Sequence, residues 1–487
     1  MTAPSPAPAP ATPAGSHRIW RRLTYLLSAR WFREMLQTIF LIYLARTSAG
    51  TFGEFMLALS LGNILLLVGE FGLNVPLVGL LKEKERDPAE ALRLVTLFKG
   101  ALLAAAWAGV LIFMAWQDYS PALRRVLLVI AVGVGLEALA STFFVALQVQ
   151  GRQKREGQVR AVAAGLGFGY GLTALALGAP PAAVAFFKLV ETLVNLAGGA
   201  ILSRARGLWQ WPRPFWSRWW VLAKHVVVFA LLEVTAVLFN RANLFFLERA
   251  AGSQGVAQYS VTWQTVDGLS VGVSSALLQS VLFPLFVDLW ESDRRAVTHL
   301  AQNTARGLLV TAVLLMFFLF LESDRLIYLV FGRQYHEAVW LQKWLVPTIL
   351  FSFLHNLAVF LLLSMRLERL VLVFYLAALA FNLIFCAVVI PRLPLPGTAL
   401  AMVCTKGFLA LLTVSYCQSR VKVLTGKSLA EITGAVLLGG GLYLACTGHM
   451  LRGFAEGLAL LPTAILAWRW WRSRELGAGA TMSGGKS

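Results

Sequence analysis

The chain has 487 residues, of which 58% are hydrophobic and 14% are charged. Soluble proteins average about 45–50% apolar and about 25% charged residues, so this composition excludes an ordinary soluble protein. The formal net charge of +19 would suggest a nucleic-acid partner in a soluble chain, so its meaning here depends on where the charge lies.

The N-terminal segment, residues 1–17, is rich in Pro and Ala and has too few apolar side chains to bury. We expect it to be a disordered tail. The basic cluster at its end leads directly into an apolar segment that is too long for a cleaved signal peptide, so this segment is predicted to stay in the mature protein.

Apolar runs recur along the rest of the chain. A helix that crosses a bilayer needs about 20 residues, and the runs fit this length. We predict an all-α integral membrane protein with about fourteen transmembrane helices and no sizeable soluble domain. The predicted spans cover residues 23–46, 55–81, 92–116, 121–149, 156–178, 181–203, 221–247, 257–286, 298–321, 339–364, 370–390, 396–418, 429–447 and 451–470.

Positive charge is concentrated on one side of this topology. With the N-terminus inside, 28 Lys and Arg residues lie in or beside the inner connections and tails, and 9 lie in or beside the outer connections. Basic connections resist translocation and contact anionic lipid on the inner leaflet, so both termini are predicted to face the cytoplasm. Anionic membrane lipid therefore accounts for the net charge, and no nucleic-acid partner is expected.

An internal repeat divides the chain into two halves. LARTSAGTFGEF, which ends at Phe55, and LERAAGSQGVAQY, which ends at Tyr259, each lead from an odd span into an even one. Parallel repeats of this kind are used by transporters. The predicted organisation is an N-lobe of six spans at 18–203, a Trp/Arg-rich interfacial connector at 204–220, a C-lobe of six spans at 221–420, two additional helices at 421–472 and a flexible tail at 473–487.

The first span carries charged side chains at a depth where charge is costly. ARWFREMLQT places Arg30, Arg33, Glu34 and Gln37 on one helical face. An arginine near mid-bilayer costs about 2.5–3.5 kcal/mol on insertion scales, so the stripe predicts a water-filled cavity or fixed partners. The structural alternative is that Glu34 neutralises Arg30 at i, i+4 while Arg33 snorkels.

Further polar residues occur in other predicted spans. They are Asn63, Glu70, Asn74, Lys99, Glu137, Lys188, Glu191, Asn195, Glu233, Asn240, Arg241, Asn243, Asp267 and Lys406. Buried carboxylates can exchange protons or bind cations, so Glu34, Glu70, Glu233 and Asp267 are candidates for ion coupling or charge pairing. Neutral, hydrogen-bonded structural acids are an equal alternative. The repeat offset also places Glu233 opposite Arg30, which would allow pairing between the halves.

No enzyme or metal motif stands out. The sequence has no P-loop, no H-E-x-x-H, no G-x-S-x-G and no Gly-rich dinucleotide turn. Its four cysteines lie in or at the ends of apolar runs, without the spacing of a disulfide framework or a metal site. We expect a transporter with no catalytic residues, no metal and no resident cofactor.

Five segments follow one another in an order and spacing that span residues 20–420. They are GTFGEFMLALSLGNILLLVGEFGLN at 50–74, VAQYSVTWQ at 256–264, LFPLF at 282–286, DRLIYLVFGRQYHEAV at 324–339 and IPRLPLPGTALA at 390–401. Together they resemble the polysaccharide biosynthesis or O-antigen (Wzx-like) flippase family of the multidrug/oligosaccharidyl-lipid/polysaccharide (MOP) exporter superfamily.

This resemblance implies two six-helix lobes that alternate access to a cationic central cavity, which accepts the diphosphate of a polyprenyl-linked oligosaccharide. Arg30, Arg33 and Gln37 would bind the substrate and Arg241 would complete the clamp, because guanidinium groups bind phosphate oxygens bidentately. The family often has an aspartate where this chain has Asn243, so a carboxylate-coupled ion site is not expected there.

The resulting expectation is a flippase of the bacterial inner membrane that works beside glycosyltransferases and a polysaccharide polymerase. Coupling to H⁺ or Na⁺ and flipping driven by the lipid gradient alone are both open. The first alternative is a cation-coupled multidrug or small-solute exporter of the same superfamily, which central arginines disfavour because they would repel a cation. The second is a membrane-embedded polysaccharide polymerase or ligase, disfavoured because the largest outer connection, 322–338, is short.

Overall fold

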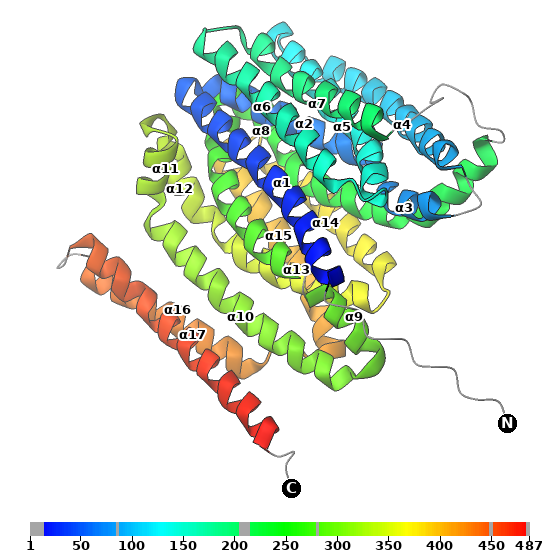
Figure 1. Ribbon diagram of the computed structural model, residues 1–487. Coiled ribbons are helices and arrows are strands. Elements are labelled where there is room, and N and C mark those ends of the chain that lie inside the picture. The colour runs from blue at the N-terminus through cyan, green and yellow to red at the C-terminus, as the bar shows by residue number, and fades with distance from the viewer. Residues whose placement is uncertain (1–13, 84–86, 204–214, 279–281, 448–450, 484–487) are drawn as a thin grey trace, which may run out of the picture. The chain divides into compact units, whose positions relative to one another are not determined.

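The computed structural model describes residues 14–83, 87–203, 215–278, 282–447 and 451–483 (Figure 1). The elements within these ranges are helices, as predicted. In chain order they are α1 (Ala14–Thr47), α2 (Ala49–Glu70), α3 (Asn74–Lys82), α4 (Pro88–Trp116), α5 (Pro121–Val149), α6 (Gln153–Ala176), α7 (Pro181–Ser203), α8 (Phe215–Leu277), α9 (Phe283–Ser292), α10 (Arg294–Leu321), α11 (Ser323–Val330), the 3₁₀ turn η2 (Arg333–Tyr335), α12 (His336–Leu345), α13 (Pro347–Ser364), α14 (Glu368–Val389), α15 (Pro394–Val421), α16 (Gly426–Cys446) and α17 (Arg452–Ser483).

Eleven helical segments of the described chain are long and apolar enough to cross a membrane. The chain is therefore a multi-pass membrane protein, and these segments coincide with eleven of the predicted spans. The other predicted spans, 23–46, 257–286 and 451–470, fall on α1, on the latter part of α8 with the residues after it, and on α17. Charged side chains interrupt the apolar character of α1 and α17, and the start of the span 257–286 shares the long helix α8, which is kinked at Gly252, with the preceding span.

Backbone contacts divide the chain into two compact units. Unit 1 comprises Met1–Thr47 and Leu57–Ala230, and unit 2 comprises Ser48–Met56 and Leu231–Ser487. The first part of α8 belongs to unit 1 because Val226 packs into an apolar cluster with α3 and α4. The predicted tails and connector fall partly on residues 1–13, 204–214 and 484–487, which lie outside the described ranges.

Glycines control how closely the helices of unit 1 approach one another. A Cβ at Gly167 of α6 would lie 2.8 Å from the Phe187 carbonyl oxygen and 2.6 Å from the Cβ of Glu191, both on α7. Gly171, one turn later, faces the rings of Phe40 and Phe187. Three aromatic rings, those of Phe40, Phe168 and Phe187, pack here at tilted angles with centroids 4.6–5.9 Å apart. Small residues thus bring α1, α6 and α7 into close contact.

Local backbone signals break two of the predicted spans, 55–81 and 339–364, and kink the helix between two others, 221–247 and 257–286. The span 55–81 forms two helices, α2 and α3, because Phe71 and Gly72 adopt positive φ angles of 44° and 64°. Pro347, which has no N–H to donate, begins α13 directly after α12. In α8 the backbone departs from helical geometry at Gly252, with φ of 66°.

The start of α2 packs very closely on α8 within unit 2. A Cβ on Gly53 would lie 1.8 Å from the carbonyl oxygen of Ser253 and 3.1 Å from the backbone nitrogen of Ala257. The neighbouring Phe52 is fully buried, and its ring meets that of Tyr335 edge-on at 6.3 Å. The two sequence repeats, which contain Gly53 and Ser253, therefore contact each other through a glycine.

Replacing Gly53 with alanine is expected to destabilise unit 2 by about 1–3 kcal/mol, because a backbone oxygen must move to admit the methyl group. Gly50 lies on the same helix with nothing within 4 Å of its would-be Cβ. Gly50→Ala should therefore leave stability unchanged or raise it slightly. Thermal unfolding of the purified variants measures both effects, and equal unfolding midpoints would contradict the packing described here.

An ion cluster joins α11 to α17 in unit 2. The guanidinium of Arg452 donates to both carboxylate oxygens of Asp324, at 2.6 and 2.7 Å, and to Glu456 Oε1 at 2.6 Å. Arg325 donates to Glu456 Oε2 at 3.2 Å. Hydrogen bonds from Arg452 hold the pKa of Asp324 well below its usual range. The bidentate geometry fixes the beginning of α17, which packs beside α16 (Figure 1).

Asp324→Asn is expected to lower the midpoint of thermal unfolding at pH 7 by about 2–4 °C, since a half-exposed ion pair contributes at most roughly 1 kcal/mol. The folded pKa of Asp324 is depressed. Its contribution is therefore complete above the usual aspartate pKa of about 3.9 and is lost as the pH falls further. Unfolding in detergent from pH 7 to pH 3 should show the difference between the two proteins beginning to narrow below about pH 4, because full loss requires the still lower pKa of folded Asp324. A constant difference would assign the stabilisation to another group.

Candidate functional site

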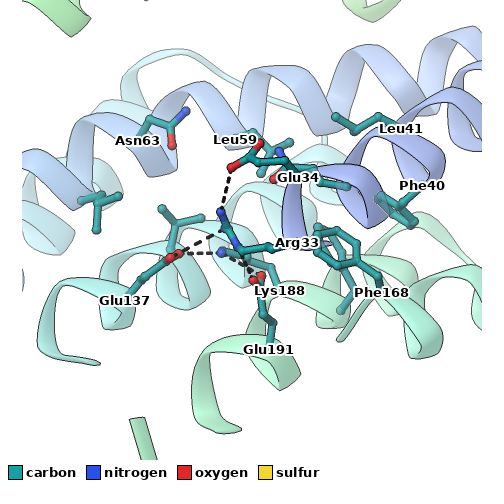
Figure 2. A pocket seen from close by; sticks show the side chains of 14 residues that line it. Arg33, Glu34, Phe40, Leu41, Leu59, Asn63, Glu137, Phe168, Lys188 and Glu191 are labelled. Carbon is teal, nitrogen blue, oxygen red and sulfur yellow. Dashed lines mark hydrogen bonds and ion pairs between the residues drawn. The ribbon is translucent and has the colours of Figure 1, made fainter. Parts of the chain in front are cut away.

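The charged stripe of α1 borders a cavity of about 240 Å³ in unit 1. Helices α1, α2, α5, α6 and α7 supply its walls, and Figure 2 shows the charged side chains gathered between them. The lining residues are Arg33, Glu34, Gln37, Phe40, Leu41, Leu59, Asn63, Leu66, Val134, Glu137, Phe168, Phe187, Lys188 and Glu191.

Arg33 is the centre of this group. Its Nε donates to Glu191 Oε1 at 2.5 Å, and its terminal nitrogens lie 3.7 Å from Glu137 Oε1 and 3.5 Å from Glu34 Oε1 (Figure 2). The side chain is 22% exposed, whereas that of Glu34 is 51% exposed. Arg33 therefore has one tight partner inside the protein and two looser ones, of which Glu34 is the most accessible.

A second cation, Lys188, lies behind Arg33. Its Nζ donates to Glu137 Oε2 at 2.6 Å and to Glu191 Oε2 at 2.9 Å. Lys188 and Glu191 are buried one turn apart on α7, and Glu137 comes from α5. Each of these two carboxylates thus contacts both cations, which is how charges can be kept inside a membrane protein.

The sequence singled out all of these residues but did not bring them together. Lys188 and Glu191 lie three residues apart in the predicted span 181–203, and Glu137 lies in the span 121–149. Opposite charges three residues apart on an apolar helix were the available signal that the face is buried. No pattern in the sequence indicated that α5 is rotated so that Glu137 faces Lys188 and Glu191.

Carboxylates outnumber cations among the charged residues that line this cavity. With every group ionised, Arg33 and Lys188 carry two positive charges, and Glu34, Glu137 and Glu191 carry three negative ones. The resemblance implied a cationic cavity, whereas this lining carries a mixed network with an excess negative charge of one. An anionic ligand at Arg33 would therefore compete with these carboxylates for the guanidinium.

The other candidates on α1 and α2 have different surroundings. Gln37 lines the cavity, whereas Arg30 is exposed and is not among the lining residues. Glu70 lies at the end of α2 and accepts a hydrogen bond from Asn74 Nδ2 at 3.1 Å. The fully buried Lys99 in turn donates to Asn74 Oδ1 at 2.7 Å, so Glu70 belongs to a separate polar cluster at the break between α2 and α3.

The remaining candidates belong to unit 2. Glu233 is exposed on α8, and Arg241 is half-buried two turns further along. Asn243, where the family often has an aspartate, is buried and donates to the Tyr259 hydroxyl at 2.8 Å. Asp267 lies 3.0 Å from Lys406 Nζ and lines a second cavity.

Comparison with known proteins decides the family. The family model described as "Polysaccharide biosynthesis protein" matches residues 44–340. The chain belongs to this family. The resemblance seen in its sequence segments is therefore confirmed. No curated protein sequence matches the chain.

Members of the MOP superfamily share the fold of this polysaccharide biosynthesis protein. The lipid II flippase MurJ in an inward closed conformation has a TM-score of 0.68 at 11% identity, covering 92% of this chain and 99% of that chain. An inward-facing multidrug resistance MATE family transporter has a TM-score of 0.60 at 14% identity, covering 80% and 94%. A MOP superfamily transporter from Pyrococcus furiosus has a TM-score of 0.54 at 14% identity, covering 83% and 95%. The chain therefore has the fold of these transporters.

Proposed function

We propose that this member of the polysaccharide biosynthesis family is a flippase. Its substrate is a polyprenyl-diphosphate-linked oligosaccharide repeat, which it moves from the inner to the outer leaflet by alternating access. The observation that carries this proposal is a paired arginine, Arg33, on the wall of a polar cavity in a chain of the polysaccharide biosynthesis family. The fold shared with a lipid II flippase supports the same substrate class.

The diphosphate binds at Arg33 by exchange of anionic partners. Phosphate oxygens accept two parallel hydrogen bonds from a guanidinium, as a carboxylate does, so the substrate replaces Glu34 and then Glu137. Glu191 stays in place because its side chain is fully buried and Lys188 also holds it. Gln37 donates to the diphosphate from the same wall, and Arg30 and Arg241 are proposed as further anion contacts.

The proposal includes the membrane arrangement. Fourteen crossings are formed by two six-helix lobes and two C-terminal helices, in the bacterial inner membrane and with both termini in the cytoplasm. The excess of Lys and Arg in the inner connections supports this orientation. The parts are a tail at 1–17, an N-lobe at 18–203, an interfacial connector at 204–220, a C-lobe at 221–420, the additional helices at 421–472 and a tail at 473–487.

The cellular role follows from the substrate class. Glycosyltransferases supply the lipid-linked repeat on the inner leaflet, and a polymerase consumes it on the outer leaflet for cell-surface polysaccharide such as O-antigen or lipopolysaccharide. Glu34 is the proposed carboxylate for H⁺ or Na⁺ uptake, because substrate binding removes its cationic partner while it stays the most exposed acid of the network. Glu70, Glu233 and Asp267 are weaker candidates for ion coupling or charge pairing.

One observation favours a second candidate. The excess negative charge of the cavity lining would suit a cationic drug or small solute, the cargo of a cation-coupled exporter. The family match favours the lipid-linked glycan instead.

Proteoliposomes that contain the purified chain and a fluorescent polyprenyl-diphosphate oligosaccharide test the proposal. The expected result is movement of the label between leaflets, measured as loss of protection from a membrane-impermeant quencher. Uptake of a fluorescent cation without movement of the lipid would establish the exporter. Elongation of the glycan in the same vesicles would establish a polymerase or ligase.

A further inference from the structure

A second cavity, of about 160 Å³ and with a mixed polar and apolar lining, lies within unit 2. Its walls come from α8, α13, α14 and α15. They combine aromatic rings with polar groups, and the lining residues are Ala236, Phe239, Asn240, Asp267, Phe351, Ser352, His355, Asn356, Tyr375, Lys406 and Leu409. The cavity is smaller than the roughly 300–1,000 Å³ of a site for drug-sized ligands.

The ammonium of Lys406 has the surroundings of a bound monovalent cation. Its Nζ lies 3.0 Å from Asp267 Oδ1 and 2.9 Å from the Ser352 hydroxyl oxygen. It also lies 4.5 Å from the ring centroid of Trp263, within the range of a cation–π contact. A carboxylate, a hydroxyl and an aromatic face are groups that hold a free cation equally well.

One more acceptor points to a cation position. The side-chain oxygen of Asn240, which lines the same cavity, is buried and has no hydrogen-bond partner. Buried polar atoms normally have partners, so an unsatisfied acceptor in the cavity that Asp267 also lines adds to its electronegative surroundings. Both ring nitrogens of His355 have hydrogen-bond partners within the protein. They lie 3.3 Å from the Thr413 hydroxyl and 3.2 Å from the Tyr375 hydroxyl.

We infer that this cavity is a monovalent-cation site that the chain itself occupies with the ammonium of Lys406. The side chain is covalently attached and 10% exposed, so it cannot leave as a dissolved ion would. Unit 2 therefore stays in the cation-loaded arrangement at every Na⁺ or K⁺ concentration.

The energetic consequence concerns the driving force of transport. A dissolved ion shifts a conformational equilibrium only through its different affinity for the two states, and its effect depends on its concentration. The tethered ammonium has no such concentration dependence, so Asp267 cannot couple transport to a Na⁺ or K⁺ gradient. Unit 1 shows the same device, since Lys188 bridges two carboxylates at 2.6 and 2.9 Å.

Removing the tether tests the inference. The purified full-length chain in detergent should show no saturable binding of Tl⁺ or radioactive Na⁺ that depends on Asp267. Lys406→Ala empties the position and leaves its ligands in place, so it should gain saturable binding, and Na⁺ should raise its unfolding midpoint by about 5 °C. Lys406→Ala with Asp267→Asn should lose both effects. Lys427→Ala, at an exposed lysine, should behave as the native chain.

Two results would overturn the inference. One is Asp267-dependent binding of Na⁺ to the native chain. The other is a folded Lys406→Ala variant without any gain of cation binding, which would make the Lys406–Asp267 pair purely structural. If the alanine variant is not recovered folded, Lys406→Ser keeps a small polar group at the position and is held to the same two outcomes.

A transport measurement gives a second test, which rests on the proposed flippase function, whereas the cation-binding measurement does not. When N-methylglucamine replaces Na⁺, Asp267 should contribute no Na⁺ dependence to flipping by the native chain, and flipping by Lys406→Ala should gain a Na⁺ stimulation that depends on Asp267. Native flipping that stops without Na⁺ through Asp267 would overturn the inference. If no variant moves the lipid, the flippase proposal fails, and the cation-binding result still decides the inference.

Discussion

Arg33→Gln is expected to reduce leaflet translocation of the lipid-linked oligosaccharide by about 100-fold. Each hydrogen bond between charged groups contributes about 1.5–3 kcal/mol, and 1.4 kcal/mol corresponds to a factor of ten. Loss of a bidentate contact with the diphosphate therefore accounts for two factors of ten. Translocation rates in proteoliposomes, normalised to the amount of inserted protein, measure the effect.

Two further variants separate charge from geometry. Arg33→Lys keeps the positive charge but not the planar fork, so an intermediate rate is expected. Arg46, an exposed arginine in the last turn of the same helix, provides a matched control, and Arg46→Gln should transport like the native chain. Native rates in both Arg33 variants would show that this guanidinium has only a structural role. An equal loss in Arg46→Gln would point to net charge instead.

Lys188→Met is expected to destabilise unit 1 by about 3–5 kcal/mol. Methionine fills a similar volume, but Glu191 and Glu137 lose a partner at 2.9 and 2.6 Å, and removing one member of a buried ion pair leaves an uncompensated charge. Thermal unfolding of the purified protein should show a fall of several degrees. Lys82→Met, at an exposed position at the end of α3, serves as the control and should unfold like the native chain.

A double variant distinguishes the charge effect from a packing effect. Lys188→Met with Glu191→Gln removes a buried cation and a buried anion together, so it should recover a large part of the lost stability. If the double variant is as unstable as the sum of the two single variants, the pair does not interact and the cause is packing alone.

The helices were largely predictable because hydropathy reports directly on burial in a bilayer. Three predicted spans do not coincide with a helix that is long and apolar enough to cross a membrane. The spans 23–46 and 451–470 carry charged side chains, and the span 257–286 shares a helix with the span before it. The break at Pro347 and the positive φ at Gly72 had local signals in the sequence. These signals locate a break, but the apolar runs on either side of it hid the division into separate helices.

The candidate site was predictable only along single helices. Helical periodicity placed Arg33, Glu34 and Gln37 on one face, and the structure places all three on one cavity. The rotation of each neighbouring helix decides which of its side chains meet that face. Close packing at glycines such as Gly167 sets this rotation. Lys188 was therefore visible in the sequence as a buried charge but not as the second cation of the site.

The balance of charge was also beyond single-helix reasoning. The family resemblance implied a cationic cavity, yet each cation of the unit 1 cavity contacts two or more carboxylates. Pairing lowers the cost of burying charge, which is why these residues can occupy a membrane interior. A mechanism of partner exchange at Arg33 follows from this pairing and not from the composition of any one span.

The central claim is that the chain recognises the diphosphate of its lipid-linked substrate. The most direct measurement compares translocation of one oligosaccharide on two polyprenyl carriers, one joined by a diphosphate and one by a neutral linker, in proteoliposomes of the native chain. The account predicts rapid movement of the diphosphate-linked lipid and about 100-fold slower movement of the neutral analogue, matching the loss in Arg33→Gln. Equal rates for the two lipids would contradict it.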